Sequence, residues 1–254
     1  MILLARELAQ AWEMLDVHDL KGTLPAFQAA VTLLVQKYGK ASMALASKFY
    51  LQQRQAAGIP GGIRVAMADP ATHDTVKTAL DDALSGLWNI APAHPQVALT
   101  TSTITDPQQI QDITAAAQAQ VQGWAEKLAQ DPARQTVINT AKKDPKAVGW
   151  ARIPEPAASP SGTCAFCAML ATRGAVYKSE RGASFKAHPG CKCHPEPLFK
   201  GQLYVPSAQI LDWQQTYAEA TKGRSGKDAR AAFRQALEGR PVTGLTTKPA
   251  ATAR

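Results

Sequence analysis

The four cysteines constrain this 254-residue chain most, because all of them lie within 30 residues of one another. They form two motifs, Cys-x-x-Cys at Cys164 and Cys167, and His-x-x-Cys-x-Cys at His188, Cys191 and Cys193. A Cys-x-x-Cys on a tight turn directs both sulfurs to one point, and an extended Cys-x-Cys places both sulfurs on one face. Thiolates with one imidazole favour Zn(II) in a closed tetrahedral site, so five candidate ligands compete for four positions.

Two other interpretations of the cysteines stay open, namely buried free thiols and two disulfides. Cys191 and Cys193 are too close in sequence to pair easily with each other. The chain carries no secretory signal, and no apolar run approaches the roughly 18 residues of a membrane-spanning helix, so we expect no membrane partner. In the reducing cytoplasm, clustered cysteines favour metal over disulfides. His194 is a weaker sixth candidate that we expect to be exposed.

The cysteines belong to a segment, residues 149–204, whose composition differs from that of its neighbours. Prolines bracket the motifs on both sides: Pro154, Pro156 and Pro160 precede them, and Pro195 and Pro197 follow. Residues 177–185 predict two short extended pieces joined by a turn at 179–182, a hairpin that returns His188 towards Cys164. A module of about 55 residues is too small for a large apolar core, and a bound metal commonly stabilises domains of that size.

Residues 1–148 show the three-and-four spacing of amphipathic helices and predict a bundle of about five helices. The apolar stripes are Leu4, Leu8, Trp12 and Leu15; Phe27, Val31, Leu34 and Tyr38, continuing through Leu45 and Phe49; Val76, Leu80, Leu84 and Leu87; and Ile110, Ile113, Ala117, Val121, Trp124 and Leu128. Gly39 predicts a kink in the second helix, and the cluster at 58–62 predicts its end.

Four Asp-Pro pairs predict helix starts, because the aspartate accepts a hydrogen bond at the N-cap and proline suits the first helical position. The aspartates of these pairs are Asp69, Asp106, Asp131 and Asp144. Between the helices, residues 89–104 predict a loop with a short β-rich stretch.

The C-terminal third is basic. Residues 1–172 hold 14 basic and 14 acidic side chains, whereas residues 173–254 hold 14 and 6, so the entire net charge of +8 lies there. Ser207 predicts the start of one helix, Gly223 to Gly226 separate it from a second, and residues 241–254 predict disorder. An asymmetric charge of this kind favours an anionic partner such as DNA. The predicted nucleic-acid-binding residues are Arg224, Lys227, Arg230, Arg234 and Arg240.

Together these features predict a mainly α protein in three parts. Residues 1–148 form a helical bundle, residues 149–204 a small α+β module rich in Cys and His and held by zinc, and residues 205–254 a basic helical tail.

The cysteine motifs also carry a resemblance to a known family. Cys164, Cys167, His188, Cys191, Cys193 and Pro197, with Trp150 ahead of them, resemble the Mu F-like domain of bacteriophage minor head proteins. The similarity is specific over residues 149–204 and extends over residues 1–148 only in composition and order. The whole chain looks like the minor capsid proteins of tailed phages of actinobacteria.

The resemblance implies a role in head morphogenesis, with the portal protein or the major capsid protein as partner. It places the chain in the virion, at the portal vertex or the capsid interior, after assembly in the host cytoplasm, with packaged DNA as a further partner. Some members of the family are labelled capsid maturation proteases, which makes a protease the alternative function. The chain shows no Ser, His and Asp at a recognisable protease spacing, and its Cys and His motifs match no common catalytic signature.

Overall fold

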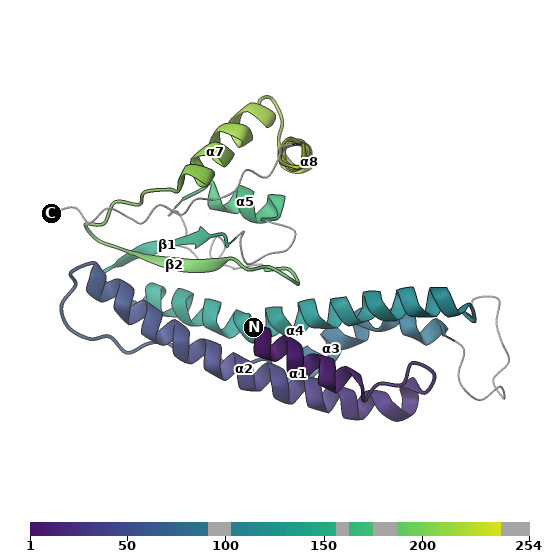
Figure 1. Cartoon of the computed structure of the whole chain (residues 1–254). Helices are drawn as coiled ribbons and strands as arrows, with labels where there is room; N and C mark the ends of the chain where they lie inside the picture. The colour runs from purple at the N-terminus through teal and green to yellow at the C-terminus, as the bar shows by residue number, and fades with distance from the viewer. Residues whose placement is uncertain (91–102, 156–162, 175–186, 240–254) are drawn as a thin grey trace. The chain divides into compact units, whose positions relative to one another are not determined.

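The computed structural model describes residues 1–90, 103–155, 163–174 and 187–239, and it is mainly α, as predicted (Figure 1). The chain divides into two compact units that alternate along the sequence. The first unit comprises Met1–Trp150, Tyr177–Cys191 and Pro197–Gln202, and the second comprises Ala151–Val176, Lys192–Glu196 and Leu203–Arg254. The predicted hairpin at 177–185, Arg240 and the tail 241–254 lie outside the described residues.

The first unit is a helical bundle whose two longest members are 37 residues each. Its elements are α1 (Ile2–Trp12), α2 (Leu20–Ala56), α3 (His73–Ala83), the 3-10 helix η1 (Ser85–Asn89) and α4 (Pro107–Lys143). At 1.5 Å per residue, α2 and α4 each extend for about 55 Å, and they pack side by side (Figure 1). None of the helices in the described part of the chain is long and apolar enough to cross a membrane.

The predicted apolar stripes form the core of this bundle, because residues spaced by three and four give each helix one continuous apolar face. Leu4, Phe27, Val31, Val76 and Val121 are almost fully buried, and Trp12, Ile110 and Trp124 pack against them from its margin. The second stripe is wrong at Leu45, whereas Phe49 is half-buried and packs against the cluster that contains Tyr50. Leu45 is exposed, and Met43, Ala46 and Tyr50 are buried in its place.

Helix α2 runs unbroken from Leu20 to Ala56, through Gly39. A Cβ on Gly39 would lie 3.7 Å from Pro132 of α4 and 3.7 Å from Pro70, so this glycine lies where two prolines approach the helix. The helix ends at the predicted cluster, where Gly58 and Gly61 adopt positive φ values of 69° and 77°. Such values favour glycine because a side chain strains the backbone there.

Of the four predicted helix starts, Asp106 alone is confirmed. Its side chain accepts a hydrogen bond from the Gln109 backbone N–H at 2.8 Å, with Pro107 as the first helical residue. Asp69 is exposed in an extended segment, and α3 begins four residues after it with Thr72 as its N-cap.

The predictions for Asp131 and Asp144 are also wrong, because neither residue begins a helix. Asp131 lies inside α4 and pairs with Lys127 at 2.6 Å and with Arg134 at 2.9 Å. Asp144 is the C-cap of α4. Its buried carboxylate forms an ion pair with Arg54 of α2, whose Nε donates to it at 3.0 Å. In both places an ion pair engages the carboxylate, and at Asp144 the carboxylate also accepts a hydrogen bond from Lys146 N–H at 2.9 Å, in a turn that leads into a strand.

A second apolar cluster lies at one end of α2 and α4. Tyr50, Val137 and Phe199 are buried in it, and the rings of Tyr50 and Phe199 meet edge to face with centroids 5.7 Å apart. The extended chain after α2 lies along α4, where Ala66 N–H donates to Thr140 Oγ1 and Ala68 N–H donates to Thr136 Oγ1, each at 3.0 Å.

Two strands pair in a small sheet, β1 (Ala147–Ile153) and β2 (His194–Phe199). Lys200 N–H donates to the Lys146 carbonyl at 2.9 Å, so the end of β2 meets the beginning of β1 and the pair is antiparallel (Figure 1). Of the predicted β-rich stretch at 89–104, the described part contains one bridge between Ile90 and Ile104.

Over its described residues, the second unit contains three helices around a small core (Figure 1). They are α5 (Ala165–Ala171), α7 (Ala208–Ala220) and α8 (Gly226–Glu238). Ser207 caps α7 as predicted, with its Oγ accepting from Ile210 N–H at 3.3 Å. Six buried residues form the core: Ala168, Met169, Ala171, Ile210, Trp213 and Phe233.

Candidate metal centre

The first cysteine motif begins helix α5. Cys164 is the N-cap residue, and its Sγ accepts a hydrogen bond from the Cys167 backbone N–H at 3.3 Å. Ala165, Ala168 and Ala171 are strong helix formers, so this short helix follows directly from the cap. Cys167 is buried and Cys164 is half-buried, and their two sulfurs lie within 4.8 Å of each other.

The third thiol of the second unit comes from the chain that enters β2. Cys193 is buried, and its sulfur lies within 4.8 Å of the Cys167 sulfur. Burial alternates from Cys191 to Glu196, with Cys191, Cys193 and Pro195 buried and the residues between them half-buried. This alternation confirms that Cys191 and Cys193 share one face of an extended segment.

Taken over the described residues, the Cys and His side chains form two groups that could hold a metal ion. One group consists of Cys164, Cys167 and His188, and the other of Cys167, Cys191 and Cys193. All four cysteines are free thiols, so the structure contains no disulfide among them. Three or more soft donors in one place fit Zn(II) in a closed site.

His188 and Cys191 are held by a turn in the first unit. Cys191 N–H donates to the His188 carbonyl at 3.1 Å, and Gly190 between them has a φ of 77°. Helix α4 makes room for this turn at Gly123, where a Cβ would lie only 3.2 Å from Pro189. His188 Nδ1 lies 2.7 Å from the Pro189 carbonyl, which can only accept. Nδ1 therefore acts as the donor in this contact.

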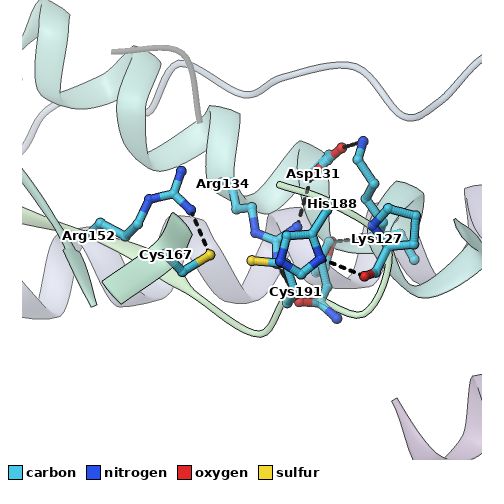
Figure 2. Close-up of polar contacts among 11 residues, drawn as sticks. Lys127, Asp131, Arg134, Arg152, Cys167, His188 and Cys191 are labelled. Atoms are coloured by element: carbon cyan, nitrogen blue, oxygen red, sulfur yellow. Dashed lines mark hydrogen bonds and ion pairs between the residues drawn. The ribbon is translucent and has the colours of Figure 1, made fainter. Parts of the chain in front are cut away.

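Arg134 of α4 fixes the backbone beside Cys191. Its Nη2 donates to the Cys191 carbonyl at 2.6 Å. Figure 2 shows the same guanidinium beside Asp131, which also forms an ion pair with Lys127. The Arg134 side chain is only 3% exposed. Through this contact with the carbonyl, Arg134 holds the backbone of Cys191 in position.

A second buried arginine contacts a thiol directly. Arg152 lies on β1 and is 1% exposed, and its Nη1 donates to Cys167 Sγ at 3.5 Å (Figure 2). A positive charge beside a sulfur stabilises the thiolate, which is the form that binds metal. Sequence reasoning missed both arginines. The available signal for Arg152 was a charged residue inside an otherwise apolar strand, Ala147–Ile153.

The remaining titratable groups near β2 take no part in the two Cys and His groups. His194 is 37% exposed and lies 3.7 Å from Glu155, a contact that is an ion pair only when His194 is protonated. Burial raises the pKa of the Glu196 carboxyl above its ordinary value. The pKa of Tyr204 is also raised, by burial first and by the charge of Glu196 second.

Four of the predicted nucleic-acid-binding residues fall in the described part of the chain, and they lie on or just before α8. Lys227, Arg230 and Arg234 are exposed, while Ala229 and Phe233 on the opposite face are buried, and Phe233 belongs to the core of the second unit. Arg224 is exposed as well, but its Nη1 donates to the Ala220 carbonyl at the end of α7 at 2.8 Å.

Comparison with known proteins gives one finding. A family model described as "VG15 protein" matches residues 2–220, which is most of the chain. No curated protein and no solved structure matches it significantly.

Proposed function

This chain belongs to the VG15 protein family, a family of phage gene products, and we propose that it is a minor capsid protein that acts in head morphogenesis. The proposal is supported by the family together with the Mu F-like order of Cys164, Cys167, His188, Cys191 and Cys193. The observation that carries it is the match over residues 2–220, which spans both the helical bundle and the cysteine motifs.

We further propose that the Cys and His groups bind one structural zinc ion. Support comes from the donors themselves, since thiolates with an imidazole fit a closed tetrahedral site that leaves no open position for chemistry. The core of the second unit is small, and six buried residues stabilise such a unit only weakly. The unit therefore depends on a further source of stability. Bound zinc would supply stability and no catalytic step.

The proposed partners follow from the role in the head. The long helices α2 and α4 suit attachment to the portal protein or the major capsid protein, at the portal vertex or the capsid interior. The experiment is a particle analysis, in which purified mature virions are examined by mass spectrometry and by a reconstruction of the vertex without imposed symmetry. We expect to find the protein in mature particles, at one vertex. If the protein is present in immature heads and absent from mature heads, the result would contradict this role and favour the maturation protease.

The exposed face of α8 is the proposed contact with packaged DNA. Lys227, Arg230 and Arg234 are spaced by three and four residues, so they form one stripe along the helix over about 10 Å. Duplex DNA carries one phosphate charge per roughly 1.7 Å of its axis. Several side chains of the stripe can therefore contact phosphates at the same time. Because Phe233 anchors the helix from its other side, the stripe faces outward.

We expect DNA binding by this stripe to depend steeply on salt and little on sequence. Each phosphate contact contributes roughly −0.9 to the slope of log K against log salt. Replacing Lys227, Arg230 and Arg234 with Gln should lower the magnitude of the slope by about two to three, as measured by fluorescence anisotropy with a duplex at several salt concentrations.

The matched control replaces Lys21, Lys40 and Lys48 with Gln. These residues are also exposed and carry the same charge, but they lie on α2. The control should leave the slope unchanged. Equal losses in both triple variants would show that net charge alone attracts the DNA, and the assignment to α8 would be wrong.

A further inference from the structure

Helices α2 and α4 of the first unit are parallel, so both begin at one end of the bundle and both terminate at the other (Figure 1). Ser42 Oγ lies 2.6 Å from the Ala129 carbonyl, and further along both helices Arg54 Nε donates to Asp144 at 3.0 Å. Exposed carboxylates lie around the end at which the two helices begin. They include Asp16, Asp19 at the N-cap of α2, Asp106 at the N-cap of α4, and Asp112.

The opposite end of the bundle carries the other sign of charge. The described chain there comprises residues 59–68, 133–150 and 197–202, and its one acidic residue is Asp144, whose side chain is 0% exposed. Five exposed cations lie in the same segments, and we call them the basic end: Arg64, Lys142, Lys143, Lys146 and Lys200. Charge that sums to zero over residues 1–172 is therefore sorted in space by the fold.

Backbone contacts bring four of these cations together. Lys142 and Lys143 lie in the last turn of α4, and Lys146 lies in the turn that follows it. Lys200 N–H donates to the Lys146 carbonyl at 2.9 Å, so these two lysines are neighbours across the sheet.

Arg64 reaches the same end along the outside of α4. Ala68 N–H donates to Thr136 and Ala66 N–H donates to Thr140, so the extended chain and the helix run in opposite directions. Two extended residues and four helical residues both span about 6–7 Å. Two residues before Ala66, the chain is therefore level with the C-terminal end of α4.

The charge of the basic end is not compensated by its surroundings. In the described chain none of its five cations pairs with a carboxylate, whereas Lys37, Lys77 and Lys127 elsewhere in the unit do. The C-terminal ends of α2 and α4 contribute about half a negative charge each. Helix dipoles thus explain the two lysines in the last turn of α4, but they leave a surplus of about four positive charges.

The composition of the basic end favours a phosphate backbone over a protein surface. Four of its five cations are lysines, which are depleted at protein interfaces, and its segments expose one large apolar side chain, that of Met67. A lysine ammonium is a point charge that suits phosphates, and contacts of this kind position a protein without reading bases.

We propose that the basic end is a second DNA-binding surface, which binds the phosphates of duplex DNA independently of α8. The exposed carboxylates at the other end repel the same polyanion, so the bundle meets DNA with the end at which α2 and α4 terminate. This surface belongs to the first unit and depends on neither the proposed zinc nor the stripe on α8.

The test replaces Lys142, Lys143 and Lys146 with Gln in the full-length protein and measures binding to a duplex by fluorescence anisotropy at several salt concentrations. Each phosphate contact contributes roughly −0.9 to the slope of log K against log salt, so the magnitude of the slope should fall by about two to three. Replacing the same lysines with Arg keeps the charge and should keep the wild-type slope. Arg64→Gln combined with Lys200→Gln tests the surface without altering α4, and it should lower the magnitude by about one to two.

The matched control replaces Arg6, Lys21 and Lys40 with Gln. These are three exposed cations of the same unit that lie outside the basic end, and their loss should leave the slope unchanged. Combining the basic-end variant with the α8 variant should add the two reductions, because the surfaces act independently.

The outcomes separate this surface from α8. A basic-end variant with the wild-type slope would reject the second surface, whatever the α8 variant does. Equal reductions in the control would show that net charge alone attracts the DNA. If the basic-end variant keeps the DNA slope but loses binding to poly-L-glutamate, the surface binds an acidic protein and the inference is wrong.

Discussion

Replacing Cys167 with Ser should unfold the second unit and spare the helical bundle of the first. Cys167 is the one cysteine that belongs to both metal-binding groups, so its loss disrupts each of them. Structural zinc contributes about 10–16 kcal/mol to the folding of zinc-finger peptides, which is as much as the whole stability of a typical domain. Hydrogen exchange read by mass spectrometry should show amides in α5, α7 and α8 exchanging nearly as fast as in an unfolded chain, while amides in α2 and α4 stay protected.

Two controls define this result. Removal of zinc from the wild-type protein by a chelator should give the same exchange pattern. Ala171→Ser places a hydroxyl on a buried position of the same helix without removing a ligand, and it should lower stability only modestly. Protection of α7 and α8 that persists in the Cys167→Ser protein would show that the apolar core, and not a metal, stabilises the second unit.

Replacing Asp144 with Ala should destabilise the first unit by about 3–5 kcal/mol, the usual effect of leaving a buried charge without its partner. The Asp144 carboxylate accepts from Arg54 Nε at 3.0 Å, from Tyr50 Oη at 3.3 Å and from Lys146 N–H at 2.9 Å, and its side chain is 0% exposed. Burial and the charge of Asp144 both raise the pKa of Tyr50, so the phenol stays protonated and keeps donating. Urea unfolding followed by the circular dichroism of the helices measures the change.

The matched control is Lys77→Ala, which removes an ion pair of shorter distance. Lys77 Nζ lies 2.6 Å from Asp81, but the two side chains are 49% and 46% exposed. Water and salt screen such a pair, so its loss should change stability by less than about 1 kcal/mol. Equal effects of the two substitutions would contradict the view that burial, and not distance, sets the strength of these pairs.

The helical bundle was largely predictable because periodicity records which face of a helix is buried. The stripes through Leu4, Val76 and Val121 are confirmed for that reason. Helix boundaries were not predictable to the same degree, since an Asp-Pro pair is compatible with a cap, an interior turn or a helix end. The choice at Asp144 depends on Arg54, which lies 90 residues earlier in the chain.

In the candidate metal centre, too, local features were predictable and tertiary contacts were not. The turn at Cys164 and Cys167 and the extended step from Cys191 to Cys193 are local, and the spacing of the residues predicts them correctly. Arg152 and Arg134 contact the cysteines only through the tertiary fold, at 15 and 57 positions from their partners. No local pattern in the sequence marks either residue as a neighbour of a thiol or of its backbone.

The alternation of the two units along the chain has a consequence for synthesis on the ribosome. Phe199 completes the apolar cluster at the end of α2 and α4, yet 48 residues separate it from Trp150, which ends the first segment of that unit. At roughly 5–20 residues per second, translation needs several seconds to cross this distance. During that interval Tyr50 and Val137 lack the ring that covers them, so the nascent bundle presents an apolar patch suited to chaperone capture. A chain terminated at residue 150 would keep that patch permanently and would be prone to aggregate.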